Sequence, residues 1–371
     1  MVITRTPYRI SFLGGGTDYP EWYREQGGAV LGTAIDKYCY ISCRYLPPFF
    51  EHRFRIVYSK IENCQHLSEI QHPVVRGILC SRDYDRGLEI HHDGDLPARS
   101  GMGSSSAFTV GFLHALDALS GRLSSKEALA REAIHVERDL LKETVGCQDQ
   151  MFAAFGGLNV IEFRRDDSFF VQPLPLSRAR LSDLNASLLL FFTGLRRIAS
   201  EVAATYVTDL RAKRAQLVRL REMVDEGTQL LTANGSLDGL GDLLHEAWQL
   251  KRGLSEAVSN SQVDEIYEAA RTAGARGGKL LGAGGGGFML FYAPPERHQR
   301  IKETLRDLLW VPFSFDTGGS QVVLYSPGQD YAELDRCRSV AQRNLLEQGR
   351  KELSGQDGAE MPQPFAPDRL R

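Results

Sequence analysis

The pattern of apolar and polar positions divides this chain into a strand-rich first part and a helix-rich second part. Over about the first hundred residues β-type runs alternate with turns, and we expect strands at 8–13, 29–35, 38–45, 53–58 and 88–92. Two helices should follow, at 104–120 and 125–142, and the second opens with the capping-box pair Ser124 and Glu127. Helical periodicity then dominates from about 198 to 275. The remaining runs predict strands at 187–193, 288–292 and 321–325 and a last helix around 296–309.

The succession of these elements indicates two domains with a boundary near 175–190. This gives an N-terminal domain over 1–180 and a C-terminal domain over 181–345. Residues 346–371 are rich in Gly, Pro and charge, which predicts a flexible tail. Because strands and helices segregate rather than alternate strictly, the α+β class is favoured over a doubly wound sheet.

Composition narrows the classes of partner. Of the 371 residues 42% are hydrophobic and 25% charged, which is typical of a globular protein in water. The net charge of −3 gives no general attraction to polyanions, so a nucleic-acid partner is disfavoured. The six cysteines form no CxxC pair, which argues against structural zinc and suits a reducing compartment. The chain has neither a signal-type apolar core nor the ~18 apolar residues of a membrane span. We therefore expect a cytoplasmic protein with no membrane partner.

One short segment concentrates glycine and serine directly before an apolar helix, at 96–107 (LPARSGMGSSSA). Glycines let a backbone approach a phosphate closely, and the free N–H groups of a helix N-terminus favour an anion. We expect nucleotide phosphates to contact Arg99, Ser100, Gly101, Met102, Gly103, Ser104, Ser105 and Ser106. The alternative is an ordinary loop with a serine N-cap, since neither the Walker pattern nor the dinucleotide fingerprint is present.

Three further segments accompany this loop. They are 7–19 (PYRISFLGGGTDY), 145–151 (VGCQDQM) and 279–288 (KLLGAGGGGF). In this order the four segments resemble the GHMP kinases, named for galactokinase, homoserine kinase, mevalonate kinase and phosphomevalonate kinase. The likeness spans about residues 5 to 325, with Met102 in place of the usual leucine. It implies an N-terminal α+β domain with a left-handed crossover, a ferredoxin-like C-terminal domain, and ATP and substrate bound between them.

The resemblance also implies Mg²⁺-assisted transfer of a phosphoryl group from ATP, which needs positioning and charge neutralisation. The implied magnesium ligands are Ser105 and Glu137, and the three consecutive serines leave Ser104 and Ser106 as alternatives. For Glu137 the alternative is a solvated helix residue. Its apolar neighbours and its twelve-residue separation from Asp149 favour the ligand.

Two residues are expected to be catalytic. Asp149, in a segment similar to the Met-Asp-Gln of galactokinases, would accept the proton of the attacking hydroxyl or orient that hydroxyl. Arg9 matches the arginine of the first family motif and would lower the pKa of the nucleophile or stabilise charge on the transferring group. The alternatives are an Asx-turn residue for Asp149 and a surface arginine for Arg9.

The late glycine run, Gly284–Gly287, could be a flexible linker. It joins two apolar segments too tightly for that, so we expect close backbone approach at Gly284 and Gly285. These residues would brace the phosphate loop and line the substrate end of the site, with Lys279 as a general electrostatic contributor.

The acceptor is expected to contact Gly15, Gly16, Thr17 and Asp18. Asp18 matches the aspartate that holds sugar hydroxyls in galactokinase-type enzymes. The two glycines stand where galactokinases carry Glu-His, leaving room for a bulkier or anionic sugar. This form is most similar to bacterial D-glycero-D-manno-heptose 7-phosphate 1-kinases, so a sugar phosphate is the expected substrate. Its distal phosphate would pair with Arg196 and Arg197, for which the alternative is a solvated turn.

Other functions remain open at this stage. An L-fucose-type or other sugar 1-kinase is the main rival, followed by a decarboxylase or a non-catalytic nucleotide-binding regulator of the same fold. Retention of the loop serines, Glu137, Asp149 and Arg9 argues against the regulator. A homodimer is one of the oligomeric states that the sequence leaves open.

Overall fold

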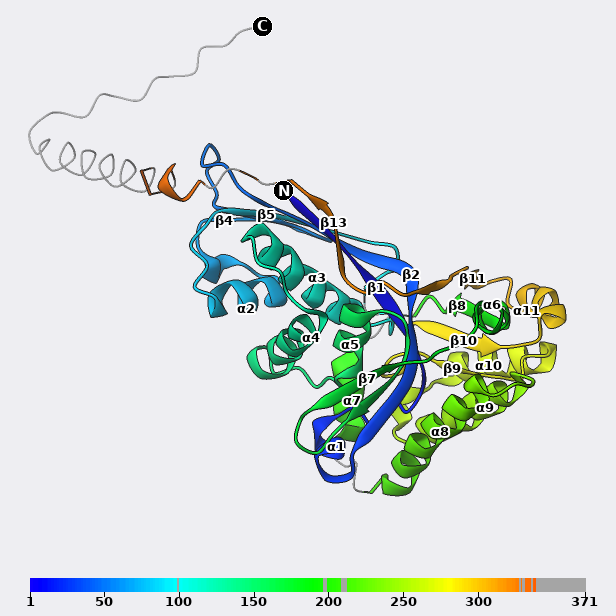
Figure 1. The fold of residues 1–371 in the computed structure, drawn as a ribbon. Coiled ribbons are helices and arrows are strands. Elements are labelled where there is room, and N and C mark those ends of the chain that lie inside the picture. The colour runs from blue at the N-terminus through cyan, green and yellow to red at the C-terminus, as the bar shows by residue number, and fades with distance from the viewer. Residues whose placement is uncertain are drawn as a thin grey trace, which may run out of the picture.

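The computed structural model describes residues 1–337 except 99, 196–198, 208–211, 327, 329–330 and 335. Two sheets organise these residues, and Figure 1 shows helices packed against both. The tail predicted at 346–371 lies outside the described residues. In the part of the chain that the structure describes, no helix is long and apolar enough to cross a bilayer.

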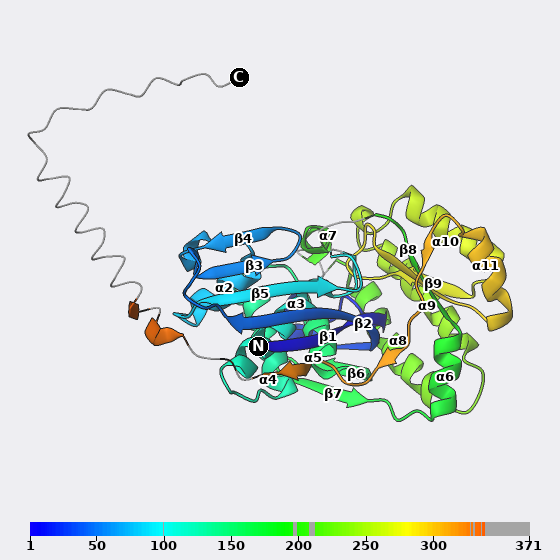
Figure 2. The ribbon, with the colours of Figure 1, turned by 90° about the horizontal axis from the view of Figure 1, so that it is seen from above.

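The larger sheet lies in the N-terminal part of the chain. Its main path runs β13-β1-β2-β5-β3-β4, and Figure 2 shows β4, β3, β5, β2 and β1 side by side in that order. These strands are β1 (Val2–Leu13), β2 (Gly28–Tyr45), β3 (Phe54–Val57), β4 (Ile61–Cys64), β5 (Leu88–Gly94) and β13 (Gln321–Tyr325). Strands β6 (Leu158–Phe163), β7 (Phe169–Pro173) and β12 (Phe315–Asp316) complete it. The β3–β5 pair is parallel, whereas β2 pairs antiparallel with each of its neighbours.

Strand β2 corrects the prediction of two strands at 29–35 and 38–45. The polar pair Asp36 and Lys37 suggested a turn, yet the strand is continuous over Gly28–Tyr45. Asp36 can stay in the strand because its backbone N–H donates to Ser314 O and its Oδ1 accepts from Ser314 N, both at 2.9 Å. The first half of β2 pairs with β6 and the second half with β5.

Helices α3 (Ser104–Leu119) and α5 (Gln148–Phe155) pack against β1 and β2, joined by α4 (Lys126–Ile134). The N-cap of α4 is Ser125, whose side chain accepts from Ala128 N, rather than the predicted Ser124. The predicted helix 125–142 is also not uniform, because His135–Leu140 winds as a π-helix. Such wide turns recur at functional sites. The remaining helices of this part are α1 (Pro20–Gln26) and α2 (Pro73–Ser81).

The second sheet has the antiparallel order β11-β8-β10-β9. Its strands are β8 (Leu188–Phe192), β9 (Gly277–Leu280), β10 (Phe288–Tyr292) and β11 (Leu309–Trp310). The helices of this part are α6 (Arg178–Ala186), α7 (Ala199–Val207), α8 (Arg214–Thr232), α9 (Asp238–Arg252), α10 (Ser261–Ala273) and α11 (His298–Thr304). Helix α9 packs on β9, and α8 reaches across to β1 and β2.

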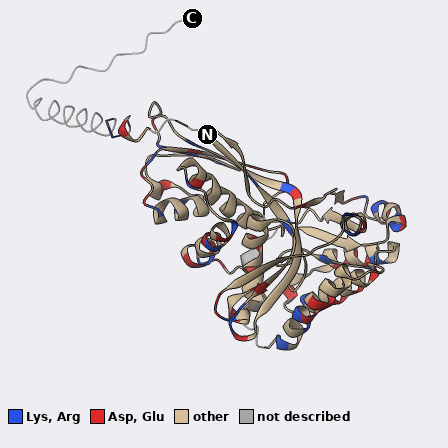
Figure 3. Ribbon diagram, viewed as in Figure 1, with Lys and Arg blue, Asp and Glu red and all other residues tan. Residues whose placement is uncertain are grey.

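The chain does not stay in the second part once it has entered it. After β11 it returns to the first sheet, where β12 pairs with β2 and β13 pairs with the start of β1. The sequence grouped residues 315–325 with the C-terminal domain, and the structure places them in the first sheet. Acidic and basic residues are interspersed along the helices (Figure 3), in keeping with a net charge near zero.

Candidate active site

The glycine-serine loop lies where α3 begins and where the two halves of the chain meet. Gly101 and Gly103 have φ of 78° and 74°, a left-handed conformation that glycine adopts without penalty. A Cβ on Gly101 would lie 2.6 Å from Leu281 O, and a Cβ on Gly282 would lie 2.5 Å from Gly101 Cα. The segment 279–288 therefore touches the predicted phosphate loop backbone to backbone.

Arg9 and Asp149 meet beside this loop. Arg9 Nε donates to Asp149 Oδ1 at 2.7 Å and Arg9 Nη2 donates to Oδ2 at 2.8 Å, while Nη1 donates to Gly101 O at 2.6 Å. The Arg9 side chain is 5% exposed and the Asp149 side chain 25%. Such a bidentate pair fixes both groups in one plane, and a quarter of the Asp149 side chain remains exposed. Arg9 thus connects the two predicted catalytic residues to the phosphate loop through hydrogen bonds.

Glu137 lies on the π-helical turn and is fully buried. It accepts hydrogen bonds from Ser106 Oγ at 2.9 Å, from Thr109 Oγ1 at 2.8 Å and from Gln150 Nε2. Burial raises the pKa of Glu137 to about 7, although the three hydrogen bonds lower it in part. The solvated-helix alternative does not describe this carboxylate.

The contact with Glu137 shows which of the three consecutive serines faces this carboxylate. Ser106 and Thr109 are three residues apart on α3 and share the face toward Glu137, whereas Ser105 is exposed. The metal role predicted for Ser105 stays a prediction, and the hydroxyl that contacts Glu137 belongs to Ser106. Thr109 was not singled out in the sequence, although its spacing from Ser106 could have indicated it.

A carboxylate beside two hydroxyls is a set of hard oxygen donors that fits Mg²⁺. Among the described residues no group of three or more acidic, histidine or cysteine side chains could hold a metal. A cation at this position would therefore take further oxygen ligands from nucleotide phosphate and water.

Asp18 is 1% exposed and its two oxygens are both occupied. Gly16 N donates to Oδ1 at 3.0 Å, and Gln148 donates to Oδ2 from its backbone N at 3.3 Å and from Nε2 at 2.9 Å. Burial, and then the nearby charge of Asp149, raise the pKa of Asp18. Thr17 is buried as well, and its hydroxyl donates to Gly14 O and Ala29 O. In this structure the hydrogen bonds of the predicted sugar-binding residue Asp18 all come from the chain itself.

Two buried lysines reach the same region from the second half of the chain. Lys279 Nζ donates to Phe12 O at 2.8 Å, and Lys251 Nζ donates to Leu280 O at 2.9 Å and to Gly282 O. Burial lowers the pKa of Lys279 to about 7 and that of Lys251 well below its ordinary value. Lys251 was missed in the sequence because nothing local distinguishes it from a surface lysine at a helix end.

Further predicted residues are two glycines that pack against another segment and three arginines. Gly285 N donates to Val258 O, and a Cβ on Gly284 would lie 2.7 Å from Val258 Cα, so both pack against that segment. Arg99, Arg196 and Arg197 lie outside the described residues.

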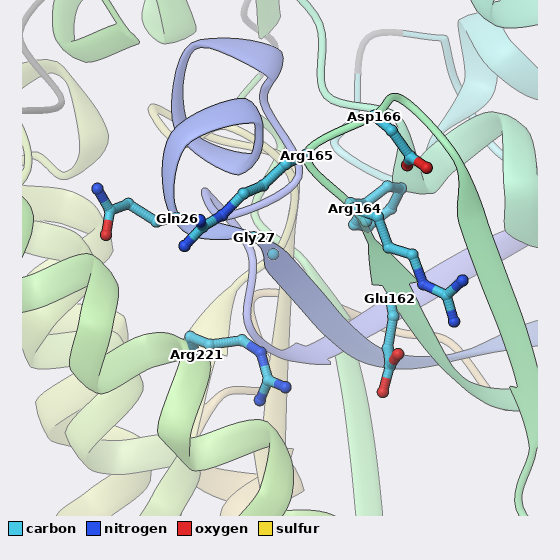
Figure 4. A pocket seen from close by; sticks show the side chains of 9 residues that line it. Gln26, Gly27, Glu162, Arg164, Arg165, Asp166 and Arg221 are labelled. Carbon is cyan, nitrogen blue, oxygen red and sulfur yellow. The ribbon is translucent and has the colours of Figure 1, made fainter.

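A separate recess lies beside the end of α1, and Figure 4 shows Arg165 and Arg221 among its lining residues. Three arginines and two acidic residues, Glu162 and Asp166, line it, and Arg221 pairs with Asp225 at 2.9 Å. None of the residues that surround Asp149 or Glu137 lines it. This recess is not part of the candidate active site.

Comparisons with known proteins find related domains and relatives along most of this chain. Residues 71–157 match the GHMP kinases N terminal domain and residues 229–309 match the GHMP kinases C terminal domain. A D-glycero-alpha-D-manno-heptose 7-phosphate kinase of Campylobacter jejuni is 29% identical over 318 residues, covering 82% of this chain and 92% of that protein. A mevalonate kinase of Methanothermobacter thermautotrophicus is 32% identical over 235 residues, covering 59% of this chain and 71% of that protein.

Two further relatives bear on the acceptor and on the fold. The bifunctional fucokinase/GDP-fucose pyrophosphorylase of Arabidopsis thaliana is 29% identical over 326 residues, and this chain spans only 31% of its length. The crystal structure of a D-glycero-D-manno-heptose 1-phosphate kinase from Bacteroides thetaiotaomicron superposes with a TM-score of 0.72 at 24% identity, covering 88% of this chain and 100% of that one. This similarity carries the fold.

Proposed function

Because the chain belongs to the GHMP kinase family, we propose that it is an ATP-dependent sugar kinase. Its proposed reaction transfers the γ-phosphoryl group of ATP to the anomeric hydroxyl of D-glycero-D-manno-heptose 7-phosphate and gives the 1,7-bisphosphate. The observation that carries the proposal is the Arg9–Asp149 pair joined to the phosphate loop through Gly101 O. The similarity to the heptose 7-phosphate kinase, along nearly the whole of that protein, supports this acceptor.

The residues divide the work in physical terms. The backbone of 101–106 and the N-terminus of α3 bind the ATP phosphates. Asp149, held by two hydrogen bonds from Arg9, orients the acceptor hydroxyl and takes its proton. Arg9 keeps the carboxylate in plane and offers positive charge to the transferring group. Glu137 and Ser106 would hold Mg²⁺, which supplies charge neutralisation between the phosphates when bound.

An L-fucose-type 1-kinase is the second candidate, because the similarity to the fucokinase relative runs over 81% of this chain. Both candidates use the same site and differ only in the acceptor.

The test is a screen of ADP release with D-glycero-D-manno-heptose 7-phosphate, L-fucose, galactose and mevalonate, each with ATP and Mg²⁺. The proposal expects turnover of the heptose phosphate well above that of the other three. Turnover of L-fucose but not of the heptose phosphate would favour the second candidate, an L-fucose-type 1-kinase. Turnover of mevalonate alone, or of none of the four, would overturn the proposal of a sugar kinase.

A further inference from the structure

A small space lies above Gly15, bordered by Ser11 and Gln148. A Cβ placed on Gly15 would meet nothing nearer than Ser11 Oγ at 3.7 Å and Gln148 Nε2 at 3.8 Å. The backbone of Gly15 does not have a positive φ, so the local conformation does not require glycine there. By contrast, a Cβ on Gly14 would lie 2.0 Å from Ala29 O. The absent side chain at position 15 thus leaves a space rather than relieving a clash.

Two polar atoms of the side chains that border this space have no hydrogen-bond partner. Ser11 Oγ and Gln148 Oε1 are buried, and neither has a hydrogen-bond partner among the described residues. Both side chains are more than nine-tenths buried, with exposed fractions of 6% and 9%. Leaving a buried oxygen unpaired costs about 1–3 kcal/mol. Two such atoms, on the two side chains that border one space, indicate that a polar group completes their hydrogen bonds.

The orientation of Gln148 follows from the chemistry of its partner. Asp18 Oδ2 accepts from Gln148 Nε2 at 2.9 Å, and an ionised carboxylate can only accept. The amide oxygen must therefore point away from Asp18 and remain an acceptor for another group. Both oxygens of Asp18 are already occupied. Asp18 therefore positions Gln148 and Gly16 and does not contact a group in the space itself.

We infer that the space above Gly15 receives one hydroxyl of the acceptor, the one next to the hydroxyl that is phosphorylated, with Gln148 and Ser11 as its hydrogen-bond partners. This inference rests on the proposed function and deepens it. Gln148 directly precedes Asp149 at the start of α5, and Asp18, which accepts from the Gln148 amide, lies near enough to Asp149 to be affected by its charge. In a sugar that reacts at its anomeric hydroxyl, the neighbouring hydroxyl is the one on C2. Gln148 and Ser11 are then specificity-determining residues, and Asp18 is a positioning residue.

The variant that tests the space directly is Gly15→Ala, because the added methyl meets only the two polar side chains named above. It should fold normally and bind ATP as the unchanged protein does. Its KM for D-glycero-D-manno-heptose 7-phosphate should rise about tenfold to a hundredfold, since the methyl takes the place of the hydroxyl. The matched control is Gly235→Ala, at a loop glycine where an added Cβ meets nothing within 4 Å. That control should leave KM and melting temperature unchanged.

A comparison with the 2-deoxy analogue of the same sugar phosphate locates the contact. The unchanged protein should lose at least tenfold in kcat/KM on the 2-deoxy acceptor, and Gln148→Met should show no such preference. Asp18→Asn should raise KM more than it lowers kcat, and its effect should not add to that of Gln148→Met, because both act on the same contact. Thermal unfolding and ATP titration of each variant separate this result from a loss of folding.

The outcomes distinguish the inference from the proposed function. If the unchanged protein phosphorylates neither acceptor, the proposed function is wrong and the inference falls with it. If it phosphorylates the heptose phosphate but Gly15→Ala keeps the same KM, or the 2-deoxy analogue is used equally well, the function stands and the inference is overturned.

Discussion

Glu137 should make the stability of the free protein depend on pH in a way that one substitution removes. Its pKa of about 7 in the folded state lies above the ordinary 4.5, so the folded protein binds more protons than the unfolded chain between these values. The contribution of Glu137 to stability is therefore fully present below pH 4.5. It is lost as the pH rises to about 7, and stability stays reduced above that pH. At 1.36 kcal/mol for each unit of pKa, the loss amounts to about 3 kcal/mol.

Glu137→Gln is neutral at every pH and should not incur this loss. Its amide can be accommodated, because Gln150 Oε1 is buried without a partner among the described residues and can accept from it after a flip of the Gln150 amide. The assay is urea unfolding of both proteins at pH 5 and pH 8, with EDTA and without nucleotide. From pH 5 to pH 8, the free energy of unfolding of the variant relative to that of the unchanged protein should rise by about 2–3 kcal/mol.

The control for this experiment is Glu127→Gln, at an exposed glutamate of α4 that pairs with Arg131. It should shift stability by a few tenths of a kcal/mol at most, because the pair is exposed to solvent. A stability difference between Glu137→Gln and the unchanged protein that is the same at pH 5 and pH 8 would refute the reasoning. In a magnesium titration of activity, Glu137→Gln should need a higher concentration; an unchanged midpoint would remove Glu137 from the metal site.

Three other outcomes are expected. Asp149→Asn should lower kcat by about a hundredfold to ten-thousandfold while the affinity for ATP stays nearly constant, and equal ADP release by the variant would exclude Asp149 from the mechanism. Gly282→Ala should weaken ATP binding and lower the urea midpoint, because its methyl would lie 2.5 Å from Gly101 Cα; unaltered binding and midpoint would contradict the contact between the two loops. A thiol reagent at pH 8 should modify Cys80 and Cys337 quickly and the four buried cysteines slowly, and rapid loss of all six thiols would show that the core opens.

Most of the local elements were predictable because their signals are local. The strands predicted at 288–292 and 321–325 match β10 and β13 to the residue. The helix predicted at 104–120 is α3 within one residue. In each case the period of apolar residues and the flanking glycine or proline suffice.

What could not be predicted depends on partners distant in the chain. The pair Asp36 and Lys37 resembles a turn until Ser314 is placed beside it. The pairing of β13 with β1 joins segments more than 300 residues apart, and no local pattern announces it.

The candidate site shows the same division. Arg9 and Asp149 could be named because they stand in motifs, and Glu137 because of its apolar neighbours and its separation from Asp149. Ser11 and Gln148 could not be identified, because their significance is an unsatisfied oxygen, which exists only after the chain has folded. The interior position of Asp18 was hidden for the same reason, since its partners come from Gly16 and from a helix 130 residues later.

The neighbourhood of β1 and β13 has a consequence during synthesis. The ribosome makes β1 first, but the strand that pairs with its opening residues appears only after some 320 more have been added. At about 5–20 residues per second, the nascent chain carries that open strand edge for roughly 15 to 60 seconds. Until β13 arrives, the edge is free to pair with another emerging polypeptide. Translation of a message truncated before β13 should therefore yield aggregates in place of a monomeric chain that lacks only this strand and the residues after it.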